Sequence, residues 1–255
     1  MLVVISPAKR LDWSEVAGVV PTVPAFAGEA VALAEVARGL SEDALARLMD
    51  LSPALAQLNH ARFRDFAAEP GAEDVRPAAF AFAGDTYAGL EARTLSEDAL
   101  RWAQGRLRIL SGLYGLLRPL DAIQPYRLEM GSRLGNPRGR DLYAWWGGRL
   151  AEALNAAAAE AGTGVLLNCA SQEYFGAVEL AALRLRVVTP VFLEDRPGGP
   201  KVISFHAKKA RGAMARFVME ERLSDPADVV AFDAGGYVHA PELSGPDRPA
   251  FLRAG

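Results

Sequence analysis

The chain has 255 residues, of which 51% are hydrophobic, which is enough to bury the core of one large domain or two small ones. Its net charge of −3 excludes the basic field over the whole molecule that is usual for nucleic-acid-binding proteins, so any site for a polyanion must be a local patch. A single cysteine excludes an intramolecular disulfide and a cysteine-rich zinc module.

The first residues lack the basic segment and long apolar run of a signal peptide, and no run of about eighteen apolar residues occurs. We therefore expect a cytoplasmic protein, a monomer without membrane association. The histidines His60, His206 and His239 are not paired at helical spacing, so no metal site is expected. No glycine-rich nucleotide-binding loop follows a strand, and we expect no cofactor.

The N-terminal third predicts one strand followed by helices. Residues 1–7 form a short apolar run closed by Ser-Pro, which indicates a buried strand and then a turn. Apolar residues at helical spacing predict a helix over 27–38. The next helix begins after Ser41, whose side chain can cap it, and the acidic residues that follow favour the positive end of the helix dipole.

Two short helices within residues 41–66 meet at Ser52 and Pro53, a capping serine followed by a proline suited to the first helical position. The second helix carries Arg62 and Arg64. This arrangement is similar in shape to a helix-hairpin-helix, which binds phosphate with backbone N–H groups at the start of its second helix. Because the usual glycine-containing hairpin is missing, an ordinary pair of packed helices is an equal alternative.

The rest of the chain alternates irregularly between strands and helices, with hairpin-like neighbours near residues 185–205. This pattern predicts a single α/β (α+β) domain over residues 1–255, with a mixed β-sheet flanked by helices. The expected strands lie in 80–90 (with a turn), 107–112, 165–170, 185–195 and 201–206, and the expected helices at 95–106, 145–161, 173–182 and 207–223.

The densest cluster of positive charge lies in the segment SFHAKKARGAMARF, on the polar face of a predicted amphipathic helix. A solvated helix face is one interpretation. An anion-binding surface is the other, because no acidic residue interrupts this face before Glu220 and because the helix dipole disfavours cations at a helix start unless an anion is bound there. The cations are Lys208, Lys209, Arg211 and Arg216, and we expect Arg216 to be plain surface.

Two further polar segments directly follow predicted strands, and ligands of α/β sheets bind at the carboxyl ends of strands. Lys9 and Arg10 come after the first strand. Asn168, Ser171 and Glu173 come at the end of the strand over 165–170, with Ser171 as a predicted helix cap. A surface turn is the alternative interpretation of the first segment.

A long irregular segment, RPLDAIQPYRLEMG, carries Arg118, Tyr126 and Arg127. Irregular stretches of this length inside a compact domain are often functional, and rigidly placed guanidinium groups suit bidentate contacts with phosphate or carboxylate. The alternative is a buried connector whose polar groups satisfy its own backbone. Cys169 is interpreted as a buried small residue rather than a reactive thiol.

These blocks resemble those of the YaaA-type peroxide stress protein family. The matching segments are, in order, MLVVISPAKRLDW, GDTYAGL, LSGLYGLLRPLDAIQPYRLEMG, LYAWWG, NCASQEYF and SFHAKKARGAMARF, from the first residue to about Asp233. His206 departs from the aromatic residue, such as tyrosine, expected at its position. The resemblance implies a cytosolic single-domain α/β protein that limits iron-mediated damage under hydrogen peroxide. It also implies a positively charged cleft, a helix-hairpin-helix element and DNA binding, but no established reaction.

Two functions of different classes are open at this point. The first is structure-selective, sequence-independent DNA binding, with affinity that falls steeply with salt. The expected DNA- or anion-binding residues are Lys9, Arg10, Ser52, Arg62, Arg64, Arg118, Tyr126, Arg127, Asn168, Ser171, Lys208, Lys209 and Arg211.

The second is an enzyme acting on a small anionic or nucleoside-like substrate. Lys9 or Lys208 would be its base or nucleophile, Arg127 its anion clamp and Glu173 its acid or base. An open groove favours DNA, whereas a closed pocket with lysine and glutamate within hydrogen-bond distance favours chemistry. Direct iron sequestration is a third hypothesis, for which the sequence offers few metal ligands.

Overall fold

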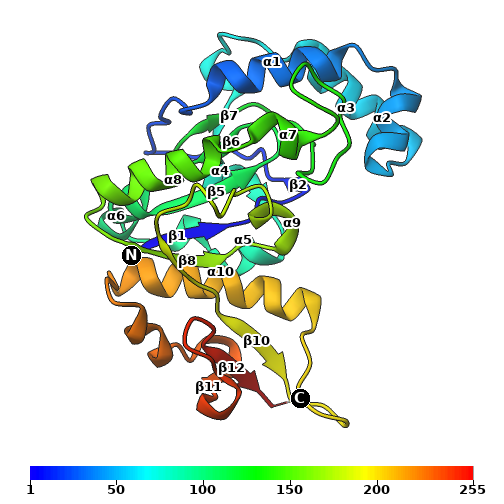
Figure 1. The fold of residues 1–255 in the computed structure, drawn as a ribbon. Coiled ribbons are helices and arrows are strands. Elements are labelled where there is room, and N and C mark those ends of the chain that lie inside the picture. Colours follow the sequence, from blue (N-terminus) through cyan, green and yellow to red (C-terminus); the bar gives the residue numbers. More distant parts are fainter. Residues whose placement is uncertain (255) are drawn as a thin grey trace.

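The computed structural model describes residues 1–254 and is built around a five-stranded sheet in the order β6-β5-β1-β8-β9 (Figure 1). Strands β5, β1, β8 and β9 are parallel, and β6 pairs antiparallel with β5 at one edge. Every residue of β1 and β5 is buried, as is typical of parallel strands covered on both faces. The predicted mixed α/β fold is confirmed. The strands are β1 Leu2–Ile5, β5 Leu107–Ser111, β6 Gly115–Leu117, β8 Val165–Cys169 and β9 Arg186–Val188.

A long helix, α10 (Ser204–Glu220), lies between this sheet and a smaller three-stranded sheet (Figure 1). It contacts β1 and β8 on one side and β10 on the other. In the smaller sheet β12 pairs parallel with β10 and antiparallel with β11. Helix α10 is therefore buried along two sides, which leaves a narrow strip for its charged residues. The strands of the smaller sheet are β10 Val191–Glu194, β11 Tyr237–His239 and β12 Ala250–Arg253.

The remaining helices surround the larger sheet, and α1, α2 and α3 form a group of their own at the top of Figure 1. No helix among residues 1–254 is long and apolar enough to cross a membrane. The α-helices are α1 Ala27–Arg38, α2 Glu42–Met49, α3 Pro53–Asp65, α4 Ala78–Ala81, α5 Asp85–Leu90, α6 Glu97–Arg106, α7 Leu142–Trp146, α8 Arg149–Glu160 and α9 Gln172–Phe175. Short 3-10 helices cover Ala72–Asp74, Ala92–Thr94, Pro226–Ala231, Ala234–Gly236 and Pro241–Leu243, and two-residue ladders join β2 Arg10–Leu11 to β4 Phe82–Ala83 and β3 Arg76–Pro77 to β7 Ala122–Ile123.

Local sequence signals predicted several elements correctly. The hydroxyl of Ser41 accepts a hydrogen bond from the backbone N–H of Ala44 at 3.2 Å and so caps α2. Pro53 occupies the first turn of α3, but Ser52 makes no capping hydrogen bond through its side chain. Helices α2 and α3 pack on each other as expected, while the phosphate-binding hairpin stays a prediction.

Four predictions about individual helices and strands were wrong. Residues 80–90 form two short helices around the two-residue strand β4 instead of a strand and turn. The helix expected over 145–161 is two helices, separated at Gly147, whose φ of 47° breaks the helix. The helix over 173–182 is the single turn α9, and residues 204–206 are the start of α10 instead of a strand.

Helices α5 and α10 pack unusually closely, because each has a glycine where they meet. A Cβ atom on Gly89 would lie 2.0 Å from the carbonyl oxygen of Lys209, and one on Gly212 would lie 1.7 Å from that of Thr86. A side chain at either position would therefore force the helices apart. This contact explains why residues 85–90, strand-like in isolation, are helical.

Candidate functional site

A cleft of about 820 Å³ opens beyond the carboxyl ends of β1 and β8. Ile5 and Cys169 are paired in register at the ends of these strands, so the segments that follow leave the sheet side by side. Ser6 Oγ accepts a hydrogen bond from the backbone N–H of Ser171 at 2.8 Å and lies 3.3 Å from Ser171 Oγ. The two strand-end segments that the sequence singled out thus meet at one site, the usual position of ligands in parallel sheets.

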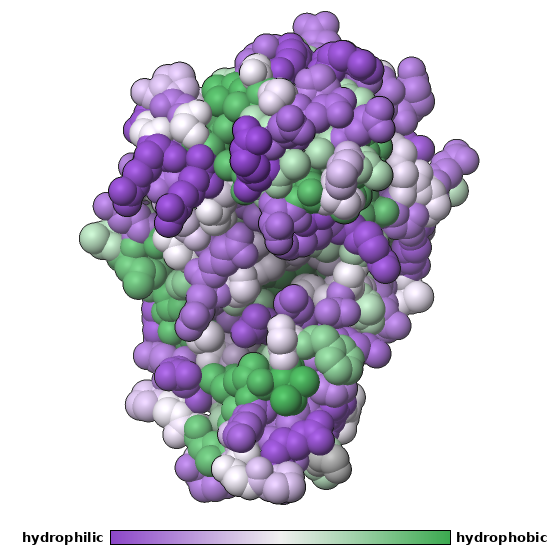
Figure 2. All heavy atoms as spheres, turned by 90° about the vertical axis from the view of Figure 1, so that its right-hand side faces the viewer, coloured by the Kyte–Doolittle hydropathy of each residue, from purple (hydrophilic) through white to green (hydrophobic). Residues whose placement is uncertain are grey.

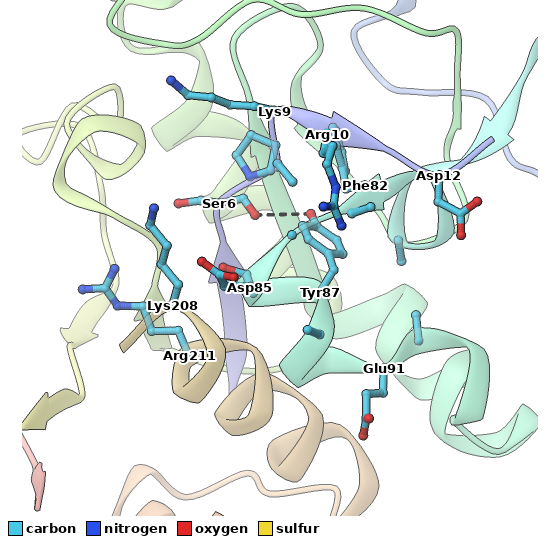
Figure 3. Close-up of a pocket in the computed structure, with 18 of the residues that line it drawn as sticks. Ser6, Lys9, Arg10, Asp12, Phe82, Asp85, Tyr87, Glu91, Lys208 and Arg211 are labelled. Atoms are coloured by element: carbon cyan, nitrogen blue, oxygen red, sulfur yellow. Dashed lines mark hydrogen bonds between the residues drawn. The ribbon is translucent and has the colours of Figure 1, made fainter. Parts of the chain in front are cut away.

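Helices α5 and α10 supply a further wall of the cleft. Figure 3 shows Lys208 and Arg211 on α10 on the same side as Ser6, with Asp85 at the start of α5 nearby and Arg10 across the opening. The face of the molecule in Figure 2 is hollowed across its middle, and hydrophilic side chains border the hollow. The close α5–α10 contact fixes this wall relative to the sheet.

Three cations of the cleft are without an ion pair in the part of the chain that the structure describes. Within residues 1–254, Arg10, Lys208 and Arg211 form no ion pair, although all three line the cleft; we call them the mouth cations. Of the four carboxylates in the lining, Asp12 pairs with Arg93 at 3.3 Å and Glu91 lies 3.7 Å from Arg216. Asp85 and Glu173 form no ion pair in the described chain. The unpaired charges of the lining therefore sum to a positive value in a protein of net charge −3.

Three aromatic side chains belong to the lining of the cleft. Phe80, Phe82 and Tyr87 line it and are 6%, 3% and 7% exposed; we call them the aromatic wall. Burial raises the pKa of Tyr87 well above its usual value, and neighbouring tyrosines add to the shift, so its hydroxyl stays protonated and donates to the carbonyl of Ser6 at 3.2 Å. The wall is thus uncharged.

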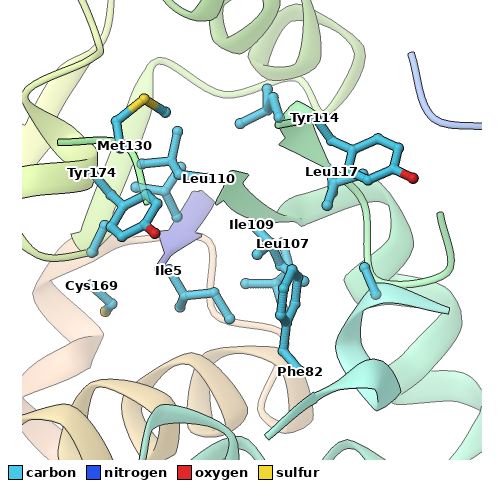
Figure 4. Packing of buried hydrophobic residues seen from close by; sticks show 14 of the residues in the cluster. Ile5, Phe82, Leu107, Ile109, Leu110, Tyr114, Leu117, Met130, Cys169 and Tyr174 are labelled. Atoms are coloured by element: carbon cyan, nitrogen blue, oxygen red, sulfur yellow. The ribbon is translucent and has the colours of Figure 1, made fainter. Parts of the chain in front are cut away.

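Cys169 also borders the cleft, but its thiol is buried. Burial raises its pKa to about 12, against a smaller opposing effect of the positive charge of Arg211. The thiolate is the reactive form, so Cys169 is an unreactive side chain of the core, as the sequence predicted. Figure 4 shows Cys169 and Tyr174 on one side of Ile5 and Phe82 on the other.

Lys9 and Arg127 both contact one buried carboxylate. Glu129 Oε1 lies 3.0 Å from Lys9 Nζ and accepts hydrogen bonds from Arg127. The other oxygen of Glu129, Oε2, is buried without a hydrogen-bond partner among residues 1–254. Lys9 reaches the cleft, with 66% of its side chain exposed, whereas Arg127 lies behind it. Arg127 therefore holds Glu129 in place instead of lining the cleft.

Arg118, Tyr126 and Asn168 lie outside the lining of the cleft. Arg118 pairs with the buried Asp121 at 2.9 Å and donates to a backbone carbonyl. The hydroxyl of Tyr126 bonds Ser111 Oγ at 2.6 Å. The amide of Asn168 accepts from a backbone N–H at 3.0 Å. Arg118 and Tyr126 fit the second interpretation of the irregular segment, in which its polar groups satisfy buried neighbours, and Asn168 likewise bonds the backbone next to it.

Lys209 and Arg216 of α10 are not part of the cleft lining. Both line a second cavity of about 440 Å³, together with His206, Tyr237 and Arg253. Arg216 donates to backbone carbonyls of α5 and bonds a carboxylate of its own helix, so the expectation of plain surface is wrong: it fastens α10 to α5. Since α10 begins at Ser204, Lys208 and Lys209 stand in its second turn, where the helix dipole acts weakly.

The candidate residues of the second and third helices are also away from the cleft lining. Arg62 is half-buried and bonds Asn59 Oδ1 at 3.3 Å. Arg64 pairs with its neighbour Asp65 at 2.8 Å. Helix α3 packs on α1 and α2, so a phosphate contact there would be a separate site.

Sequence reasoning missed Asp12, Asp85, Tyr87 and Arg93 as cleft residues. The signal was present in GDTYAGL, whose glycines mark close packing, but that segment was interpreted as a strand and turn. Between residues 1 and 254, no group of three or more histidine, cysteine, aspartate or glutamate side chains is placed to hold a metal ion.

Comparison with known proteins identifies relatives over nearly the whole chain. A family model described as "Peroxide stress protein YaaA" matches residues 1–243. The UPF0246 protein of Ruegeria pomeroyi is 62% identical over 253 residues, covering 99% of this chain and 98% of its own. Those of Jannaschia sp. and Cereibacter sphaeroides are 61% and 60% identical, with at least 97% of each chain covered. The chain therefore belongs to the YaaA family of peroxide stress proteins.

Proposed function

We propose that the protein acts in the response to hydrogen peroxide by binding the nucleic-acid backbone at its cleft, without reading base sequence. The observation that supports this is the mouth cations. Arg10 comes from the segment after β1, and Lys208 and Arg211 come from α10, yet all three line one cleft without ion pairs in the described chain. Unpaired lysine and arginine side chains are the groups that bind phosphates and release their counterions.

Phosphate contacts alone position a protein on DNA and carry no sequence information. In this proposal the protein covers DNA in cells under peroxide stress, which limits the damage that iron and peroxide cause there. The peroxide role rests on family membership, and the DNA role rests on the charges of the cleft.

The direct test is the salt dependence of binding to a duplex of mixed sequence, measured by fluorescence anisotropy. With about three phosphate contacts, affinity should fall about 40-fold between 50 and 200 mM salt, because the logarithmic slope is about −0.9 per phosphate neutralised. Lys208→Ala should weaken binding and lower this slope by about one. The neighbouring Lys209→Ala is the matched control, since it removes the same charge from a residue outside the cleft lining and should cost at least about threefold less.

Salt-independent binding would contradict the proposal, and so would equal losses for Lys208→Ala and Lys209→Ala. In cells that lack the gene, wild type and the Lys209→Ala variant should restore survival in hydrogen peroxide. A variant that combines Lys208→Ala with Arg211→Ala should not.

The enzyme hypothesis has less support from the geometry. Lys208 is exposed, and Glu173 accepts a hydrogen bond from the backbone N–H of Gly131 at 3.0 Å instead of contacting a lysine. The lysine–glutamate contact beside the cleft joins Lys9 to Glu129, where Arg127 shares the same carboxylate oxygen. An ion pair of this kind fixes the positions of the lysine and the glutamate more readily than it activates either one as a base or nucleophile.

A further inference from the structure

The cleft combines two chemical environments that a duplex backbone alone would not use. Its lining includes both the mouth cations and the aromatic wall, whose rings are almost fully buried. Guanidinium and ammonium groups bind phosphate oxygens, while aromatic side chains contact the flat faces of bases. A ligand with a phosphate at one end and a ring at the other would satisfy both.

The size of the cleft fits such a ligand. Its volume of about 820 Å³ lies within the range of about 300–1,000 Å³ that is typical of small-molecule sites. A duplex lying across the opening keeps its bases stacked inside the helix, out of reach of the aromatic wall. A single nucleotide is small enough to enter.

Further polar groups of the lining match the middle of a nucleotide. The hydroxyls of Ser6 and Ser171 and the side chain of Thr86 line the cleft, and Asp85 and Glu173 add carboxylates without an ion pair in the described chain. Hydroxyls both donate and accept, and carboxylates accept from the hydroxyls of a sugar or the amino group of a base.

We propose that the cleft holds one nucleotide unit, with its phosphate on the mouth cations and its base against the apolar lining that Ala83, Ala88 and the small exposed part of the aromatic wall provide. The unit is a free mononucleotide or a nucleotide turned out of a strand, since both present the same phosphate, sugar and base. This inference rests on the proposed function for its phosphate contacts and adds a site for the base.

The first experiment separates the contributions of phosphate and base by calorimetry. AMP should bind at least about tenfold more tightly than ribose 5-phosphate, which lacks the base, and than adenosine, which lacks the phosphate. Equal affinity for AMP and ribose 5-phosphate would overturn the inference, because the aromatic wall would then contribute nothing.

The second experiment distinguishes the two sources of the nucleotide unit, a free mononucleotide and a nucleotide turned out of a strand. 2-Aminopurine in an unpaired position of an oligonucleotide changes its fluorescence when it leaves the stack, and the protein should change that emission if the unit comes from a strand. Binding of AMP without this change assigns a free mononucleotide, and the change without AMP binding assigns a strand. If AMP does not bind and the emission does not change, the site is refuted.

A filling variant tests the place of the base. Ala88 lines the cleft and is exposed, so Ala88→Phe should occupy the space without disturbing the core. It should lower affinity for AMP at least about tenfold. Ala54→Phe on α3 adds the same ring outside the lining and should leave AMP binding unchanged. Ala83→Phe, from β4, is a second filling variant if the first unfolds.

The results also separate the two proposals. Because Ala88→Phe keeps the mouth cations, it should leave the salt-dependent affinity for duplex DNA within about twofold. AMP binding in a protein that binds no duplex would refute DNA binding and leave the nucleotide site standing. Duplex binding with an AMP affinity that neither filling variant changes would refute the nucleotide site alone.

Discussion

At the scale of single residues, burial controls the chemistry of the Cys169 thiol beside the cleft and of the Glu194 carboxylate in the smaller sheet. Cys169 lines the cleft, yet only 1% of its surface is exposed and its pKa is raised to about 12. An exposed thiol at the same place would be a candidate sensor of peroxide. The buried one has almost no thiolate at neutral pH.

We predict that Cys169 resists alkylation in the native protein. At pH 8 iodoacetamide should modify it at least about a hundredfold more slowly than in the protein unfolded by guanidinium chloride, because the thiolate is both rare and inaccessible. Mass spectrometry of timed samples measures this ratio. Equal rates in the native and unfolded protein would contradict the assignment.

Glu194 is a buried carboxylate held by two donors. It is fully buried, accepts a hydrogen bond from the hydroxyl of Tyr237 at 2.5 Å and pairs with Arg253 at 2.8 Å. Burial alone would raise its pKa, but these hydrogen bonds and the charge of Arg253 outweigh burial and hold the pKa below its usual value. A lowered pKa stabilises the fold above the unfolded value of about 4.3, and this stabilisation is lost as the pH falls below it.

Glu194→Gln should therefore lower the free energy of unfolding by about 2–4 kcal/mol at pH 7, since it leaves Arg253 without its buried partner. The difference from wild type should shrink as the pH falls below about 4. Urea titrations at several pH values measure both effects. Asp247→Asn, which removes an exposed pair with Arg186, is the control and should cost less than about 1 kcal/mol. If the loss of unfolding free energy in Glu194→Gln did not change with pH, the charge of Glu194 would not be its cause.

At the scale of elements, the contact between α5 and α10 shapes the cleft. Both helices carry residues of its lining, and their glycines allow their backbones to touch. Asp85 and Tyr87 on α5 and Lys208 and Arg211 on α10 keep their relative positions only while this contact holds. A change here should affect stability and ligand binding together.

Gly89→Ala and Gly212→Ala should each destabilise the protein by about 2–3 kcal/mol, because the added methyl meets backbone atoms that cannot move independently. Gly105→Ala is the matched control. It also changes a helical glycine, but nothing lies within 4 Å of the added atom, so it should be neutral or stabilising by up to about 1 kcal/mol. Thermal unfolding measures all three. Similar effects for Gly89→Ala and Gly105→Ala would contradict the close contact.

At the scale of the whole molecule, α10 joins two sheets into one body. On the side of the smaller sheet, Phe232 packs edge-on against Phe192, Phe217 and Phe251 at centroid distances of 5.5–5.8 Å. Helix α10 is buried on its other side against β1 and β8. Neither sheet covers α10 alone, so we expect the two to unfold together.

Calorimetry should accordingly show one transition, with the calorimetric and van't Hoff enthalpies equal. Phe232→Ala, which removes the ring at the centre of the cluster, should destabilise by about 3–5 kcal/mol and lower that transition as a whole. A separate early transition in the variant or the wild type would show that the small sheet is an independent unit, and would refute the expectation of a single domain.

The sequence by itself determined the parts of this protein that depend on local pattern. Buried strands follow from uninterrupted apolar runs such as residues 1–5, and Ser41 caps its helix because its hydroxyl reaches a free N–H three residues on. The positions of Lys9 and Ser171 after strands indicated a shared site, because parallel strands end at the same edge of a sheet. The family blocks in order indicated the peroxide stress family.

Only the tertiary structure decided which cations share the cleft. Lys208 and Lys209 are adjacent in sequence but line different cavities, since successive residues of a helix point about 100° apart and α10 is packed on two sides. The helical state of residues 85–90 was likewise decided by glycine contacts with a helix more than a hundred residues away. Whether a cation has an ion-pair partner depends on distances in the folded structure. The sequence alone therefore does not distinguish its paired cations from its unpaired ones.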